Sequence, residues 1–221
     1  MSTVVAIDGP SGAGKSTVAR RVASELGLEV LDTGAMYRAV TLAVLEAGVD
    51  PIDADRCAAV AARVLIEQRG PQTLLDGRNV SVEIRSPPVN ASVSTVSANP
   101  AVRRVLVDHQ RSWVTARGGG VVEGRDIGTV VFPDAVIKVF LTASEAERAR
   151  RRRDEAAPGA AVSVEAVRED LGRRDQLDST RAASPLVAAD DAIRIDTTGR
   201  PVDDVVREVV KQVRARTGAS Q

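Results

Sequence analysis

Cysteine, histidine and aromatic residues are scarce in this chain. Cys57 is the only cysteine, so no disulfide can form within the chain, and this usage fits a reducing compartment. Aromatic side chains make up 2% of the sequence, so the core must consist mainly of valine, alanine, leucine and isoleucine. The single histidine, His109, falls on the apolar face of an expected helix, where we expect it to have a structural role.

Neither sign of charge is in excess, and no long apolar run occurs. The 30 basic and 30 acidic residues cancel, which argues against a surface built for nucleic acid or an anionic membrane. No apolar run approaches the roughly 18 residues of a membrane span, and the apolar residues 1–7 are too few for a signal peptide. We therefore expect a soluble, cytoplasmic protein with no nucleic-acid or membrane partner.

What the sequence does contain is an alternation of short apolar runs and helical patterns. Residues 4–7 form a run typical of a buried parallel strand, and residues 29–31 form a second one. Between them, apolar residues recur at helical spacing over 18–26 and stop at a glycine. Asp32 or Thr33 is expected to cap the next helix. This order predicts a parallel sheet with helical crossovers.

The pattern changes between residues 63 and 84, where three short strands are expected. Gly70-Pro71 and Asp76-Gly77 separate them, and Asp-Gly is a strong hairpin signal. Pro87-Pro88 closes the segment. We therefore predict a small antiparallel meander, inserted into the α/β frame, with strands at 63–67, 72–76 and 79–84.

The second half returns to the α/β pattern. Asn99-Pro100 is an N-cap followed by proline, and it begins a helix that three glycines end. The apolar face of this helix is expected to carry Val102, Val105, Leu106, His109 and Trp113. The further expected elements are strands at 121–123, 136–141 and 192–196 and helices at 144–153, 163–176 and 202–215, with a break at 156–159. The prediction is an α/β fold: a parallel sheet of about five strands, flanked by helices.

A glycine-rich loop follows the first expected strand and matches G-x-x-x-x-G-K-[ST], so the expected parallel sheet is of the P-loop NTPase type. Its glycines let backbone N–H groups point inward around a phosphate, at the positive end of the next helix. Lys15 can reach the β- and γ-phosphates, and the Ser16 hydroxyl can ligate Mg²⁺. The residues expected to bind ATP are Gly9, Pro10, Ser11, Gly12, Ala13, Gly14, Lys15, Ser16 and Thr17.

Two further polar segments follow expected parallel strands, at the sheet edge where ligands bind. Residues 32–38 offer Thr33, Tyr37 and Arg38, although an ordinary capped helix with a surface arginine explains this segment equally well. After the strand at 121–123, Arg125 is either a phosphate clamp or half of a surface ion pair.

Glu123 ends that same apolar strand. It is either a ligand of Mg²⁺ or of a metal-bound water, or a strand-end carboxylate that faces solvent. Further along the chain, arginines are dense: Arg148 and all four residues 150–153 are arginine, with few acidic residues nearby to pair with them. We expect a lid that closes over the triphosphate and neutralises its charge.

These segments resemble, in combination and order, the bacterial cytidylate kinases of the nucleoside monophosphate kinase family. The resemblance covers nearly the whole chain. It implies that ATP phosphorylates CMP or dCMP with Mg²⁺. We also expect a monomer. The segments that carry it are residues 7–15, Asp32-Thr33-Gly34-Ala35-Met36-Tyr37-Arg38, residues 124–134 and Arg181-Ala182-Ala183-Ser184-Pro185-Leu186.

The resemblance also implies roles for individual residues. Arg38 and Arg125 match positions that hold the acceptor phosphate. The cytosine-reading positions are Ser94, Arg103 and Asp126, with Arg181 supporting them; Thr33 and Tyr37 line the same pocket, and Arg174 and Asp178 match sugar contacts. Lys15, Arg125, Arg148 and Arg152 are the expected catalytic residues. This chain has Thr33 where the family often has serine and Ser16 where it often has glycine, and both keep a plausible site.

The same resemblance implies a division of the chain into three parts. Residues 1–32, 97–147 and 184–221 form a nucleotide-binding core, 33–96 a monophosphate-binding insert, and 148–183 a lid. The residues alone leave two alternatives open. One is a P-loop kinase for another acceptor, such as AMP, UMP or shikimate. The other is a nucleotide-binding switch without metabolic turnover, although the Asn-Lys-x-Asp motif of GTP switches is absent from the sequence.

Overall fold

The computed structural model describes residues 3–154, 163–181 and 184–218. The chain folds as two compact units. We call Met1–Val30 together with Gly118–Gln221 the sheet unit, and Leu31–Arg117 the insertion unit. Each unit has a buried apolar cluster that consists mainly of aliphatic side chains, as expected from the scarcity of aromatic residues.

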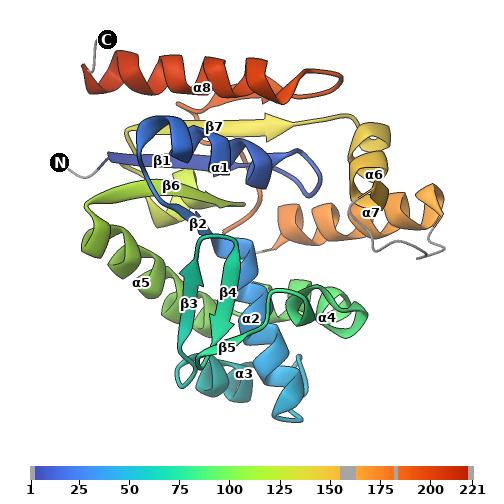
Figure 1. Ribbon diagram of the computed structural model, residues 1–221. Helices are drawn as coiled ribbons and strands as arrows, with labels where there is room; N and C mark the ends of the chain where they lie inside the picture. The colour runs from blue at the N-terminus through green and yellow to red at the C-terminus, as the bar shows by residue number, and fades with distance from the viewer. Residues whose placement is uncertain (1–2, 155–162, 182–183, 219–221) are drawn as a thin grey trace. The chain divides into compact units, whose positions relative to one another are not determined.

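The sheet unit is built on a parallel sheet of five strands, in the order β2-β6-β1-β7-β8 (Figure 1). The register of β1 with β6 aligns Asp8 with Gly124, so the loops after these two strands begin side by side. This confirms the predicted fold class. The strands are β1 (Thr3–Asp8), β2 (Val30–Asp32), β6 (Gly119–Gly124), β7 (Ile137–Thr142) and β8 (Ile193–Asp196).

Two helices pack together along this sheet, α1 (Lys15–Leu26) and α8 (Val202–Thr217) (Figure 1). Their valines and alanines form one cluster with the apolar residues of β1 and β7. Gly27, in the left-handed conformation, ends α1 as the sequence predicts. The short π-helix η2 (Ile127–Val131) follows β6 and was not expected.

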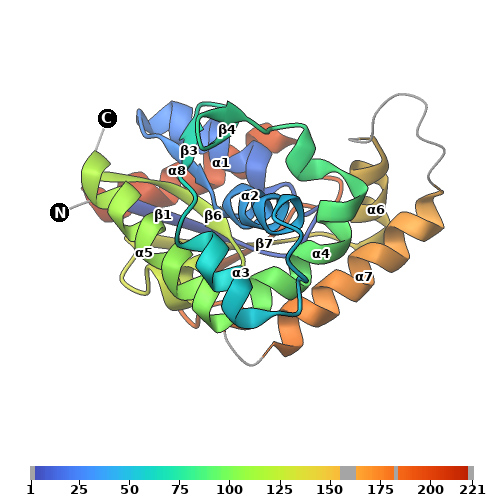
Figure 2. The same ribbon diagram turned by 90° about the horizontal axis from the view of Figure 1, so that it is seen from below.

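The remaining helices of the sheet unit are α6 (Glu145–Asp154) and α7 (Val164–Thr180), which pack side by side (Figure 2). Ser144 and Ser163 cap them through their side-chain oxygens, which accept from the backbone two to three residues into each helix. Helix α7 runs four residues further than the predicted end at 176. The predicted break at 156–159 lies outside the described residues.

The insertion unit contains the predicted meander, with strand order β3-β4-β5 and antiparallel pairing. Asp76 and Gly77 both have positive φ, as a tight hairpin turn requires. The third strand is shorter than predicted, because the Asn79 side chain accepts from the backbone of Ser81 and turns the chain away. The strands are β3 (Ile66–Arg69), β4 (Gln72–Leu75) and β5 (Arg78–Asn79).

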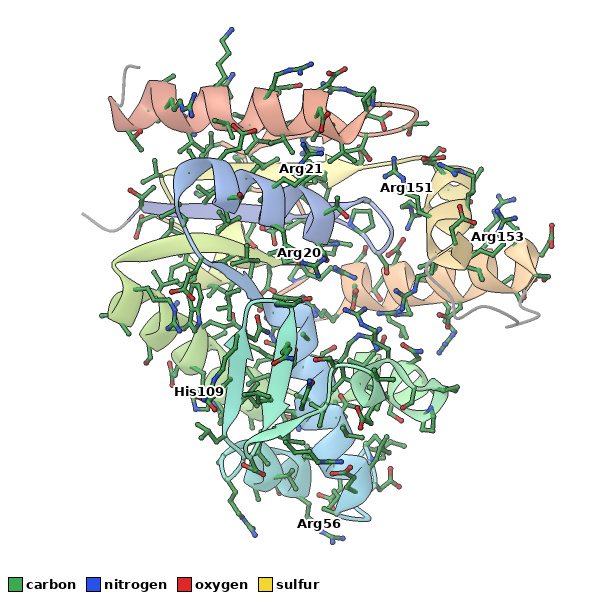
Figure 3. The ribbon with its side chains drawn as sticks, in the orientation of Figure 1. Arg20, Arg21, Arg56, His109, Arg151 and Arg153 are labelled. Carbon is green, nitrogen blue, oxygen red and sulfur yellow. The ribbon has the colours of Figure 1, made fainter. Side chains whose placement is uncertain are left out.

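Helices make up the rest of the insertion unit. Asn99 caps α5 as predicted, with its Oδ1 accepting from the Ala101 N–H at 2.9 Å. The predicted apolar face of α5 is wrong in one respect: the buried residues recur every four positions from Val102, and His109 is exposed (Figure 3). The elements are α2 (Thr33–Glu46), α3 (Ala54–Ala61), η1 (Glu83–Arg85), α4 (Pro87–Ala98) and α5 (Pro100–Arg117). None of the helices described is both long enough and apolar enough to cross a bilayer.

Candidate active site

The loop between β1 and α1 has the backbone that a phosphate loop requires. Gly9, Gly12 and Gly14 all have positive φ. At Gly9, with φ +146°, a Cβ would lie 2.1 Å from the carbonyl oxygen of Leu141. At Gly12 a Cβ would lie 2.9 Å from the Cβ of Arg148, so α6 packs directly on the loop. Only glycine fits both positions.

Replacing Gly9 with alanine is therefore expected to destabilise the fold. Backbone strain and overpacking against Leu141 together cost about 4 kcal/mol, which lowers Tm by roughly 10 °C. Gly199→Ala is the matched control, because Gly199 also has positive φ (+64°) but a Cβ there meets nothing within 4 Å. Its expected cost is about 1 kcal/mol. Thermal unfolding of both variants measures the difference, and equal losses would contradict the close approach at Gly9.

Lys15 and Ser16 begin α1 and are held by neighbouring polar groups. Lys15 is 8% exposed, and its Nζ donates to the Pro10 carbonyl at 2.8 Å. The Ser16 hydroxyl donates to Glu123 Oε2 at 2.9 Å, and Glu123 is buried at the end of β6. A hydroxyl beside a carboxylate is a hard oxygen donor set, which suits Mg²⁺ with the remaining positions taken by phosphate oxygens and water.

The residues after β6 join an ion-pair network with the end of α7. Arg125 Nε donates to Asp178 Oδ2 at 3.0 Å. Arg181 places its Nη2 3.5 Å from Asp126 Oδ1 and its Nη1 3.9 Å from Asp178 Oδ1. Asp126, Asp178 and Arg181 have side chains that are nearly buried. The structure thus brings four of the predicted acceptor residues together within the sheet unit.

Arg174, one turn before Asp178 on α7, belongs to a cationic cluster. It is buried, and its Nε has no hydrogen-bond partner among the described residues. Burial lowers the pKa of Arg174 from its ordinary value, and the charges of Arg125 and Arg152 lower it further. Asp170 and Asp178 oppose this effect only in part, so the charged form of Arg174 is disfavoured here, and a bound anion would stabilise it.

The arginines of α6 do have acidic partners, so the expectation that such partners were too few is wrong. Arg150 and Arg151 both bond Glu147, at 2.8 Å, and Arg153 pairs with Asp154. Glu147 lies three and four residues before its partners, which is one helical turn. Arg153 points into solvent (Figure 3), where such pairs contribute little.

The other two arginines of α6 have different surroundings. Arg148 is buried, donates to the Ser11 carbonyl at 3.2 Å and pairs with Asp175 on α7. Asp175 Oδ1 also accepts from the Ser11 N–H at 3.4 Å. Arg152 is half-buried and contributes to the field at Arg174. Helices α6 and α7 are thus both tied to the phosphate loop.

The other predicted acceptor residues lie in the insertion unit. Tyr37 and Arg38 are buried on α2, and the Arg103 guanidinium lies 5.4 Å from the centre of the Tyr37 ring. Arg38 Nη1 donates to the Ile84 carbonyl at 2.9 Å and to Asn90 Oδ1 at 2.7 Å. Thr33 is buried at the start of α2, and Ser94 is half-buried on α4.

Comparison with known proteins decides the family. A sequence model described as cytidylate kinase matches residues 5–215. The chain belongs to the cytidylate kinase family. It is 52% identical to the cytidylate kinase of Mycobacterium leprae (strain Br4923) over 217 residues, which are 98% of this chain and 97% of that relative. It is 54% identical to the cytidylate kinase of Mycobacterium avium (strain 104), with 95% of each covered. The predicted family is therefore confirmed.

Among solved structures, a protein of undescribed function from Eubacterium ventriosum ATCC 27560 has a similar fold. The TM-score is 0.55 at 12% identity, and the match covers 97% of this chain and 99% of that one. At this identity the likeness concerns the fold alone. The α/β fold is thus found in a protein of very different sequence, and membership of the cytidylate kinase family rests on the sequence matches.

Sequence reasoning about this cytidylate kinase family member missed three residues that hold site residues in place. Asn90 holds Arg38, Asp175 holds Arg148, and Asp8 at the end of β1 binds the backbone after Asp126. Asp8 had a signal, because it is a lone carboxylate at the end of an otherwise apolar strand. Within the described residues, no group of three or more histidine, cysteine or acidic side chains is placed to hold a metal ion by itself.

Proposed function

We propose that this protein transfers the γ-phosphoryl group of ATP to CMP or dCMP, giving ADP and CDP or dCDP. Membership of the cytidylate kinase family supports this, because two relatives with that name are 52% and 54% identical over nearly the full length. The alternatives, another acceptor such as AMP, UMP or shikimate, or a switch without turnover, are not favoured.

The observation in the structure that carries the proposal is the cationic cluster of Arg125, Arg152 and Arg174. It lies in the same unit as the phosphate loop, and although Asp170 and Asp178 offset part of its charge, the pKa of the buried Arg174 guanidinium remains below its ordinary value. A chain that only bound or hydrolysed ATP would have less need of these three further cations, of which Arg174 is buried. Two anions brought together, a triphosphate and a monophosphate, explain both the loop and the cluster.

Phosphoryl transfer depends on alignment and on charge neutralisation more than on a covalent nucleophile. In the proposed mechanism Lys15 binds the β- and γ-phosphates, and Arg125, Arg148 and Arg152 stabilise the charge that spreads over the transferred group. Ser16 and Glu123 would hold Mg²⁺, partly through water, and the bound ion would neutralise phosphate charge. The acceptor is already a phosphate anion, so no strong general base is needed. The exposed position of the only histidine agrees with this.

The residues proposed for the acceptor are those that the resemblance to the family implies. Thr33, Tyr37, Arg38, Ser94 and Arg103 come from the insertion unit. Arg125, Asp126, Arg174, Asp178 and Arg181 come from the sheet unit. In this proposal residues 33–96 are the monophosphate-binding insert, 148–183 the lid, and 1–32, 97–147 and 184–221 the core. A monomeric enzyme located in the cytoplasm, with no nucleic-acid or membrane partner, remains our prediction.

An acceptor screen tests the proposal. The purified protein is incubated with ATP and Mg²⁺, and ADP formation is followed with CMP, dCMP, UMP, AMP or shikimate. CMP and dCMP are expected to exceed AMP and shikimate in kcat/KM by at least about 100-fold, and chelation of Mg²⁺ is expected to stop the reaction. Faster turnover of AMP would overturn the proposed acceptor. ATP hydrolysis that is independent of any monophosphate would instead favour a switch.

A further inference from the structure

Asp8 is a buried carboxylate that links the donor loop to the segment after β6. It is the last residue of β1, directly before Gly9, and it is 5% exposed. Its Oδ1 accepts from the Ile127 N–H and its Oδ2 from the Gly128 N–H, each at 2.8 Å. Each oxygen of one side chain thus binds the backbone of a segment more than a hundred residues away in the chain.

These two hydrogen bonds replace a helix cap. Ile127 and Gly128 are the first residues of η2, and their N–H groups have no partner inside that helix. The residue before them, Asp126, occupies the cap position, but its side chain makes no capping hydrogen bond. Its side chain is directed at Arg181 instead. The Asp8 carboxylate satisfies both donors from outside, so the capping of η2 does not depend on the Asp126 side chain.

Burial of a carboxylate costs free energy, which hydrogen bonds and nearby positive charges only partly offset. Burial raises the pKa of Asp8 to about 6, and the charge of Asp126 also raises it, while the two backbone N–H groups and Lys15 lower it. Apolar residues at strand ends are common and would avoid this cost. Because the charges of Lys15 and Asp126 both act on Asp8, Asp8 lies near one residue of the donor loop and one residue of the acceptor set.

We infer that Asp8 is a positioning residue for the acceptor nucleotide. By holding the backbone of Ile127 and Gly128, it fixes the direction in which Arg125 and Asp126 leave the end of β6. The inference rests on the proposed function, since it assigns those two side chains to the acceptor. Asp8 itself touches neither nucleotide. Because β1 continues directly into the phosphate loop, the same residue keeps the acceptor-binding segment in register with the donor.

Asp8→Asn tests this inference. Asparagine keeps the size and one acceptor oxygen, but its NH₂ group faces the other backbone N–H, so one hydrogen bond is lost. At pH 8 the KM for CMP is expected to rise about tenfold, the effect of one hydrogen bond to a charged group. The KM for ATP is expected to stay within about twofold, because the phosphate loop itself is unchanged.

Val209→Ala is the matched control for a loss of stability alone. Val209 is fully buried on α8, in the apolar cluster of the sheet unit. It is expected to lower Tm at unchanged KM for CMP and for ATP. If Asp8→Asn does not fold, Asp8→Ser replaces it, since serine is smaller, accepts one hydrogen bond and leaves room for a water.

The outcomes separate this inference from the proposed function. If the wild-type protein does not phosphorylate CMP, the proposed function fails and the inference fails with it. If the wild type is active on CMP, the inference alone is at stake. It is then overturned if the variant raises the KM for CMP and for ATP by the same factor, or if it lowers Tm and leaves the KM for CMP unchanged.

Discussion

Lys15→Ala is expected to lower kcat by about 1,000-fold, the size of effect that follows removal of one preorganised charge at a transferring phosphoryl group. Lys15 is nearly buried at the start of α1, where its Nζ reaches back to the Pro10 carbonyl across the loop. The ammonium group is thereby held inside the curve of the loop, where the β- and γ-phosphates of ATP are expected. Steady-state kinetics with saturating ATP and CMP measures the loss.

The fold is expected to survive this substitution. Loss of the hydrogen bond from Lys15 to the Pro10 carbonyl is expected to cost about 1 kcal/mol of stability, a shift of a few degrees in Tm. Lys211→Ala is the matched control, because Lys211 is an exposed lysine on α8 and should leave kcat unchanged. Near-normal turnover of Lys15→Ala would show that the loop binds phosphate without the proposed role for its lysine.

The phosphate loop and the strands of the sheet could be predicted because their signals are local. A continuous apolar run, a glycine-rich loop and a helical repeat each lie within about fifteen residues, and the order of elements then implies a parallel sheet. The hairpin at Asp76-Gly77 is equally local, since two residues with positive φ decide it. For these segments the neighbouring residues contain the information that the fold uses.

The helices α3 and α4 could not be predicted from local signals. Helix α4 begins with Pro87 and Pro88 and is rich in serine and valine, which are mediocre helix formers. It is helical because Val89, Val93 and Val96 become buried, with Val89 in the cluster that includes the apolar residues of α2. This stabilisation is tertiary, so it becomes visible only when α2 and α4 are placed together. Helix α3, with eight residues, is too short to show a repeat.

The candidate site, too, could be predicted only in part. The types of its residues could be listed from the sequence, but the partners of those residues could not. Arg148 was expected to meet phosphate, and in the structure it pairs with Asp175 on the next helix. The pairing of Arg125 with Asp178 joins residues 53 positions apart. Such contacts depend on how α6, α7 and β6 pack, and no spacing rule within one segment contains them.

Asp126→Ala is expected to lower kcat/KM for CMP by about 100-fold, while the affinity for ATP changes by less than about threefold. Asp126 is buried at the end of β6, and its carboxylate can accept from the exocyclic amine of cytosine. Without it, the amine loses the charged acceptor proposed for it. Initial rates with CMP, and ATP titrations followed by calorimetry, measure the two quantities separately.

The same variant should also lose discrimination between cytosine and uracil. UMP presents a carbonyl oxygen where CMP presents its amine, so the carboxylate of Asp126 repels UMP and attracts CMP. We expect the ratio of kcat/KM for CMP to that for UMP to decrease by at least about tenfold in Asp126→Ala. In Asp126→Asn this ratio is expected to lie between those of the wild type and Asp126→Ala, because an amide can pair with either base. Arg181 keeps Asp178 as a neighbour, at 3.9 Å, so the fold should persist. Equal losses for CMP, UMP and ATP would instead show that Asp126 supports the structure and does not read the base.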